Sequence, residues 1–165
     1  MIRTRKSYSD MEPLNGADPW VVRTDFSNDD IWMRICNLIS APQIEGEMQF
    51  FAYVDYVNDD SHREQQPVDL VRSLPDTYPD MVCFAVDRDC IENPEHPILV
   101  IGFYPSDNES FERLPHETPA ADIATFRAVP SQIQGIQNNL SLANMDFEDF
   151  ADSVDKDGVF RGFSN

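Results

Sequence analysis

Six aspartates stand at the ends of three predicted strands, where side chains that do chemistry often lie. Asp25 follows the first strand, Asp55, Asp59 and Asp60 close the second, and Asp87 and Asp89 close the third. If these strands run parallel, their carboxyl ends share one edge of the sheet, which is where open α/β sheets bind ligands. Carboxylates gathered there could bind a cationic group, hold Mg²⁺ for phosphoryl transfer, or raise one another's pKa for general acid catalysis.

An ordinary structural role competes with this interpretation, because Asp is a common turn and helix-cap residue after a strand. The chain has no Gly-rich phosphate loop with a paired Lys, and Asp25-Phe26-Ser27 departs from the DxDxT pattern of haloacid dehalogenases. The structural role is therefore favoured, and the aspartate rim is kept as the candidate catalytic site.

His96 is the histidine best placed to act as a general base, since it follows Glu95 and lies close in sequence to the turn at residues 87–89. The candidate catalytic set of an enzyme is thus Asp25, Asp55, Asp87 and His96. All three histidines, His62, His96 and His116, fall in acidic loops that contain proline. We expect their side chains to be exposed to solvent.

Two segments near the carboxyl end contain oxygen ligands. The turn SVDKDG resembles a calcium loop, but Ser153 and Ser164 occupy the first and twelfth positions, where Asp and Glu are needed. A turn that ends a helix is the better interpretation, and no metal is expected. Asn139 and Asn144 either cap the junction of two helices, which is favoured, or bind a ligand together with Asp59, Asp60 and Asp89.

Charge is the most unusual global property of this chain. It has 30 acidic and 12 basic residues among 165, a formal net charge of −18. Such a surface repels nucleic acids and anionic membranes and suits a basic protein or a cationic small-molecule ligand, although solubility alone also explains it. No apolar run approaches the roughly 20 residues of a membrane span.

The cysteines indicate the compartment. There are three, an odd number, with neither a CxxC motif nor a Cys-His pair at zinc spacing. We expect free, buried thiols in a reducing compartment, and hence a cytoplasmic location. No cofactor is expected.

Apolar periodicity predicts the elements that position these residues. Strands are expected at residues 20–26, 48–57, 81–86, 97–104 and 125–129, and helices begin near residues 27, 67, 130 and 147. Ser27 is expected to cap the first helix, with Asp30 three residues on. Polar loops are expected at residues 87–96 and 105–122, and a flexible arm at residues 1–18. The pattern predicts one α/β domain over residues 19–165, a sandwich of packed helices and a mixed, partly parallel five-stranded sheet.

Three segments carry a family resemblance: WVVRTDFSNDDIW, ENPEHPILVIGF and the tail NNLSLANMDFEDFADSVDKDGVFRGF. With these, the chain resembles a family of small, mostly uncharacterised proteins that share a domain of unknown function. The resemblance implies one folded unit from about residue 20 to residue 163, and it implies no activity, cofactor or catalytic residue.

The leading functional hypothesis is an acidic interaction protein, an inhibitor or accessory factor that binds a basic partner. The alternative is a cofactor-free enzyme, an isomerase, cyclase or hydrolase, that uses the carboxylates at the edge of the sheet. A metal-dependent phosphotransfer enzyme comes third.

Overall fold

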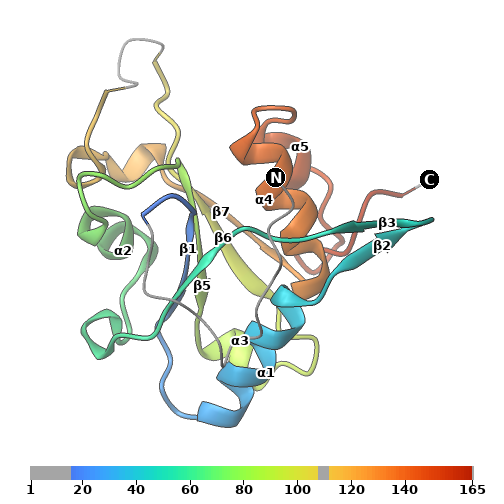
Figure 1. Ribbon diagram of the computed structural model, residues 1–165. Helices are drawn as coiled ribbons and strands as arrows, with labels where there is room; N and C mark the ends of the chain where they lie inside the picture. Colours follow the sequence, from blue (N-terminus) through green and yellow to red (C-terminus); the bar gives the residue numbers. More distant parts are fainter. Residues whose placement is uncertain (1–15, 108–111, 165) are drawn as a thin grey trace.

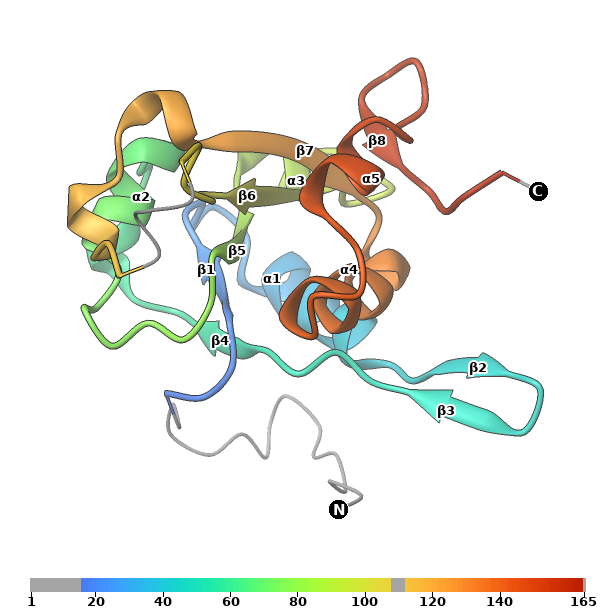
Figure 2. The same cartoon turned by 90° about the horizontal axis from the view of Figure 1, so that it is seen from above.

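The computed structural model describes residues 16–107 and 112–164, and its centre is a six-stranded sheet (Figure 1). The strand order is β4-β1-β5-β6-β7-β8. These strands are β1 (Trp20–Arg23), β4 (Asp55–Val57), β5 (Val82–Val86), β6 (Ile98–Gly102), β7 (Ala124–Ala128) and β8 (Val159–Phe160). A separate hairpin, β2 (Gln43–Glu45) and β3 (Met48–Phe50), projects from the body (Figure 2).

The sheet is mixed. Strand β1 pairs in parallel with β4 and β5, β6 pairs antiparallel with β5 and β7, and β8 runs parallel to β7. The predicted α/β class with a mixed, partly parallel sheet is confirmed. The strand count was one too low, because the terminal extended piece contributes β8 to the edge beside β7.

Helices cover both faces of the sheet. They are α1 (Asp29–Ser40), α2 (Pro67–Ser73), α3 (Arg88–Glu92), α4 (Ile133–Ser141) and α5 (Phe147–Ala151), with short 3₁₀ turns η2 (Asp60–His62), η3 (Pro115–Glu117), η4 (Ala120–Asp122) and η5 (Pro130–Gln132). One core cluster joins α1, α3, α4 and α5 to one face, and a smaller one joins α2 to the other. The result is three layers, with the sheet between them (Figures 1 and 2).

Apolar side chains drive this arrangement. Trp32 and Ile35 of α1, Phe84 of β5 and Phe150 of α5 are almost completely buried in the larger cluster. Burying a side chain of this size stabilises the fold by about 1.5–3 kcal/mol. Cys36, Cys83 and Cys90 are free and buried, as expected. Burial raises the pKa of each thiol, so none is prepared to act as a nucleophile.

Three sequence-based expectations about local structure were wrong. Residues 48–57 are not one strand: β3 and β4 are separated by irregular chain, where Tyr53 N donates to Gln137 Oε1 at 2.7 Å. The expected loop at residues 87–96 contains α3, which Asp87 caps by accepting from Cys90 N at 3.2 Å. The cap of α1 is Asn28 rather than Ser27.

Most of the predicted flexible arm, residues 1–15, lies outside the described residues. Within residues 16–107 and 112–164, no helix has both the length and the apolar character that crossing a membrane requires.

Candidate functional site

The carboxyl ends of β1 and β5 border a cleft of about 640 Å³, here named the rim cleft. Its floor is apolar, with Leu70, Leu99 and Ile101. Its charged border consists of Asp25, Asp87, Asp89, Glu64, Arg88 and Arg127. The structure thus brings together three of the predicted aspartates at the expected edge of the sheet.

Asp25 is held as an anion. Its Oδ1 accepts hydrogen bonds from the backbone N at 2.9 Å and the Oγ of Ser27, and its Oδ2 lies 3.7 Å from Arg88 Nε. Burial raises the pKa of Asp25, but the Ser27 hydrogen bonds and the charges of Arg88 and Arg23 outweigh it and lower the pKa overall. A general acid needs the opposite shift, so the geometry favours a structural role for Asp25.

Arg127 binds the other two rim aspartates. Its Nη1 and Nη2 lie 3.0 and 2.7 Å from the two carboxylate oxygens of Asp87, and Nη2 lies 3.2 Å from Asp89 Oδ2. The Asp87 hydrogen bonds raise the pKa of Arg127 above its usual value. Since Asp87 also caps α3, its carboxylate joins β7, β5 and α3 and has a clear structural function.

The other predicted rim residues lie elsewhere. Asp59 and Asp60 follow β4 but do not line the cleft: Asp59 Oδ1 accepts from Ser61 N at 2.9 Å, and Asp60 pairs with Arg63. The placement of Asp55 at the rim was wrong. Asp55 begins β4, opposite Trp20 at the start of β1, and so belongs to the other edge of the sheet. The physical reason is that β4 is only three residues long and begins where the strand was expected to end.

The expectation of exposed loop histidines was wrong for two of the three. His96 is only 5% exposed and His62 only 9%, whereas His116 is exposed. His96 Nδ1 lies 2.8 Å from Cys90 O, and the residue does not line the rim cleft. Its neighbour Glu95 accepts from Arg161. His96 therefore fastens α3 to the loop before β6 and is not directed at the rim aspartates.

The carboxyl-terminal candidates have local structural partners. Asn139 Nδ2 donates to Gly135 O at 2.7 Å, within α4, while Asn144 is exposed between α4 and α5. The turn after α5 ends that helix, as predicted, and Arg161 donates to both Asp155 and Asp157. Across residues 16–107 and 112–164, no group of three or more His, Cys, Asp or Glu side chains has a metal-binding arrangement.

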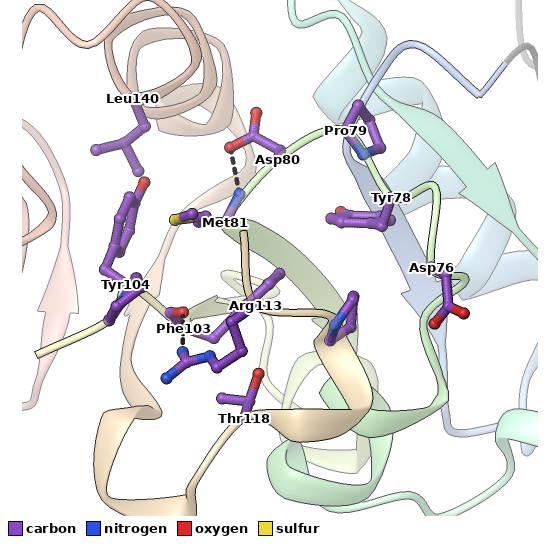
Figure 3. A pocket seen from close by; sticks show the side chains of 12 residues that line it. Asp76, Tyr78, Pro79, Asp80, Met81, Phe103, Tyr104, Arg113, Thr118 and Leu140 are labelled. Atoms are coloured by element: carbon purple, nitrogen blue, oxygen red, sulfur yellow. Dashed lines mark hydrogen bonds between the residues drawn. The ribbon is translucent and has the colours of Figure 1, made fainter. Parts of the chain in front are cut away.

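A second cleft, of about 310 Å³, lies at the opposite end of β5 and is here named the Asp80 cleft (Figure 3). The segment before β5, the end of β6 and the chain from Arg113 to Thr118 form its walls. Its lining is Asp76, Tyr78, Pro79, Asp80, Met81, Phe103, Tyr104, Pro105, Arg113, Pro115, Thr118 and Leu140.

Asp80 has a different environment from the rim aspartates. Its Oδ1 accepts from Met81 N at 2.8 Å and its Oδ2 from Ser141 Oγ at 2.6 Å. It has no ion pair with any residue that the structure describes. Burial raises the pKa of Asp80, and the hydrogen bonds from Ser141 and Met81 only partly offset this effect. Asp80 is thus a desolvated carboxylate without a counter-ion among the described residues.

The Tyr104 hydroxyl lies in a negative electrostatic potential. Burial raises the pKa of its hydroxyl, and the charges of Asp80, Glu148 and Asp146 raise it further. The Tyr104 hydroxyl forms no hydrogen bond within the described part of the chain. By contrast, Tyr78 Oη accepts from Trp20 N and donates to Val82 O, both at 2.8 Å, and so has a structural function.

The far wall of the cleft holds Arg113 and Thr118. Arg113 pairs with Asp122 and donates to Phe103 O at 3.0 Å, so its charge is largely compensated. Thr118 is 1% exposed, and its Oγ1 has no hydrogen-bond partner among the described residues. In Figure 3 this hydroxyl lies below the Arg113 side chain, on the cleft side of its segment.

No sequence pattern pointed to Asp80, Tyr104, Arg113 or Thr118 as functional residues. Asp80 stands directly before a strand and Thr118 between two prolines, positions that resemble ordinary turns. Their properties arise from partners far along the chain: Ser141, which donates to Asp80, is 61 residues away. A carboxyl group before a fully buried strand was the only available signal.

Comparison with known proteins identifies the family. No curated protein and no solved structure is significantly similar to this chain. The sequence model of the domain of unknown function DUF6924 matches residues 18–163, which include every element of the sheet and its helices. The resemblance noted from the sequence is thereby confirmed, and the chain belongs to the DUF6924 family.

Proposed function

We propose that this DUF6924 protein is an acidic interaction protein whose basic partner docks at the Asp80 end of the sheet. The distribution of charge supports this proposal. Residues 1–15, 108–111 and 165 contain as many bases as acids, so the whole net charge of −18 belongs to the described residues. The excess of negative charge is therefore a property of the folded unit.

Most arginines of the folded unit form ion pairs with Asp or Glu residues of the same chain. Six of them form ion pairs: Arg23, Arg63, Arg88, Arg113, Arg127 and Arg161. Two of these, Arg88 and Arg127, line the rim cleft at the carboxyl end of β5. Arg161 pairs with Glu95, in the turn after α3. The remaining acids can attract cations from outside the molecule.

The observation that carries the proposal is the group of Asp80, Asp146 and Glu148 around Tyr104. All three carboxylates raise the pKa of the Tyr104 hydroxyl, and none of them forms an ion pair with a described residue. A cation brought by a partner would offset the cost of desolvating Asp80 and the negative potential that the three carboxylates produce at Tyr104. At the rim, arginines of the chain already perform this function.

The experiment uses a peptide of about ten residues that alternates Arg and Gly, whose attraction should fall with ionic strength. Isothermal titration at low salt should show binding, weakened several-fold at physiological salt. The variant Asp146→Asn/Glu148→Gln should bind more weakly than the control Glu45→Gln/Glu47→Gln, which removes the same charge from the β2–β3 hairpin. Equal weakening would contradict docking at this end, and the absence of binding would contradict the proposed function.

A cofactor-free small-molecule enzyme is the second candidate, and the raised pKa of Asp80 is the observation that favours it. In such an enzyme Asp80, rather than Asp25 or Asp87, is the general acid, because burial raises its pKa and the Asp80 cleft lies beside it. Conversion of a metabolite that Asp80→Asn abolishes and Asp25→Asn retains would support this function over the first.

A further inference from the structure

We propose that the Asp80 cleft binds an arginine residue of the basic partner, with the guanidinium group at Asp80 and Tyr104 and a backbone carbonyl at Thr118. This inference rests on the proposed function and names the chemical group that the site recognises. Two independent observations support it: a carboxylate without a counter-ion, and a buried hydroxyl without a hydrogen-bond partner, both in the lining of one cleft.

The backbone N and O of Thr118 both form hydrogen bonds, whereas its side-chain hydroxyl has no partner among the described residues. Its N donates to Pro115 O at 3.1 Å, and its O accepts from Arg72 Nε at 3.1 Å. A buried hydroxyl without a partner is unfavourable, and native proteins have few of them. Because the Thr118 hydroxyl belongs to the cleft lining, a ligand that enters beside Arg113 can supply the missing partner.

Asp80 provides the anionic end. The hydrogen bonds from Met81 N, the Val82 backbone and Ser141 Oγ fix the orientation of its carboxylate and leave it able to accept from a further donor. A planar guanidinium matches two carboxylate oxygens with parallel N–H donors, whereas an ammonium group is a more strongly hydrated point charge. A fixed and partly desolvated carboxylate therefore favours arginine over lysine.

Aromatic and apolar side chains separate the two polar ends. Tyr104, Met81 and Phe103 line the cleft between Asp80 and Arg113, as Figure 3 shows. The methylene groups of an arginine side chain pack well on such a surface, and its guanidinium gains from an aromatic ring nearby. The volume of about 310 Å³ lies at the lower end of the range for ligand pockets and suits a single residue.

The Thr118 end suits a neutral carbonyl rather than an anion. Arg113 retains N–H donors beyond those used for Asp122 and Phe103 O, and the Thr118 hydroxyl can also donate. Asp122 compensates the charge of Arg113, and Asp76 and Asp80 border the same cleft. A free carboxylate would be repelled there, whereas a peptide carbonyl accepts hydrogen bonds without adding negative charge.

The test compares three small probes by isothermal titration with the full chain: N-acetyl-arginine amide, n-butylguanidine, which has the same single charge but no carbonyl, and N-acetyl-glutamine amide, which lacks the charge. We expect N-acetyl-arginine amide to bind most tightly. Asp80→Asn should weaken it about tenfold or more, the effect of losing a hydrogen bond to a charged group. Thr118→Val should weaken it about fivefold and leave the affinity for n-butylguanidine unchanged, while Thr118→Ser should retain the affinity for N-acetyl-arginine amide.

Thermal unfolding of each variant shows whether it is folded. If Thr118→Val does not fold, the affinities of the unaltered chain decide the carbonyl contact: N-acetyl-arginine amide should bind several-fold more tightly than n-butylguanidine, and equal affinities would overturn the contact. If the arginine–glycine peptide binds in a salt-dependent way but Asp80→Asn and Thr118→Val leave all affinities unchanged, this inference is overturned and the proposed function stands. If neither the peptide nor N-acetyl-arginine amide binds, both are overturned. Equal affinity of Thr118→Val and the unaltered chain for N-acetyl-arginine amide would overturn the carbonyl contact.

Discussion

Strand β5 has an aspartate beyond each end, and the fold treats the two carboxylates in opposite ways. At the carboxyl end, Asp87 caps α3 and lies between two donors of Arg127. At the amino end, Asp80 accepts from Met81 N and Ser141 Oγ, and no described cation pairs with it. The three aspartates of the rim cleft are therefore paired with arginines, while Asp80 has no counter-ion among the described residues.

The pKa shifts follow the same division. Hydrogen bonds and nearby arginines lower the pKa of Asp25 at the rim despite its burial, whereas burial dominates and raises the pKa of Asp80. A carboxylate whose ionised form stabilises the folded state has a structural role. A carboxylate whose ionised form destabilises the folded state is instead a candidate for a functional role. Five predictions, from the largest expected effect to the smallest, test this contrast.

The amino end depends on close packing rather than on ion pairs. A Cβ atom on Gly102 of β6 would lie 2.7 Å from two ring carbons of Phe147 in α5. We expect Gly102→Ala to lower the free energy of unfolding by about 3 kcal/mol, the upper end of overpacking effects, in urea titrations. The matched control is Gly135→Ala, where the added Cβ meets open space in α4 and should stabilise by about 0.5–1 kcal/mol. Equal effects of the two changes would contradict this account of the α5 contact.

The carboxyl end depends on Asp87. Asp87→Ala removes the cap of α3 and leaves the half-buried Arg127 with Asp89 alone as its carboxylate partner. We expect a loss of about 2 kcal/mol in the free energy of unfolding, from the cap and the charged hydrogen bonds together. A loss below about 0.5 kcal/mol would place Asp87 among ordinary surface residues and restore the rim as a candidate site.

Asp80→Asn should have the opposite sign. Because the pKa of Asp80 is raised, the folded state binds this proton more tightly than the unfolded state, and ionisation costs stability at neutral pH. We expect the melting temperature to rise by roughly 2–4 °C, which corresponds to about 1 kcal/mol in a domain of this size.

The pH dependence separates the two ends. The gain from Asp80→Asn should fade as the pH falls through the raised pKa of Asp80 toward the unfolded value of about 4. Asp25→Asn should destabilise at neutral pH, and this cost should fade as the pH falls below about 4 through its lowered pKa. Scanning calorimetry from acid to neutral pH would reveal both trends, and a shared sign would undermine the comparison.

The smallest effect concerns the two tyrosines of the Asp80 cleft. Tyr104→Phe should change the free energy of unfolding by less than about 0.5 kcal/mol, because its hydroxyl has no hydrogen-bond partner among the described residues. Tyr78→Phe serves as the matched control and should cost about 2 kcal/mol, since Trp20 N and Val82 O lose their partner. Chemical denaturation of both variants measures the difference. A comparable loss for the two would mean that Tyr104 is structural.

Much of the fold was predictable from local patterns. The apolar runs at β1, β5, β6 and β7 and the helical spacing of Ile31, Ile35 and Ile39 survive in the structure, because long buried elements impose their period on the sequence. Short elements leave no such pattern. Helix α3 has five residues and β8 has two, and both owe their conformation to contacts with distant residues such as Arg127 and β7.

The candidate site was less predictable than the fold. The sequence correctly placed Asp25, Asp87 and Asp89 at one edge, because a residue that follows a parallel strand must lie at that edge. It misplaced Asp55, because a continuous apolar run concealed the break between β3 and β4. It gave no weight to Asp80, whose environment comes from α4, β6 and the chain near Thr118.

By itself, the sequence determined the layered α/β class, the negative charge and the free thiols, since these follow from composition and from periodicity within single elements. Only the tertiary structure decided which aspartates are compensated. The sequence lists the charges without the distances between them, and a carboxylate's pKa depends on the water, donors and cations within a few ångströms. Asp25 and Asp80 are chemically identical in the sequence, and the surroundings that the fold assembles make one a stabilising anchor and the other a candidate binding group.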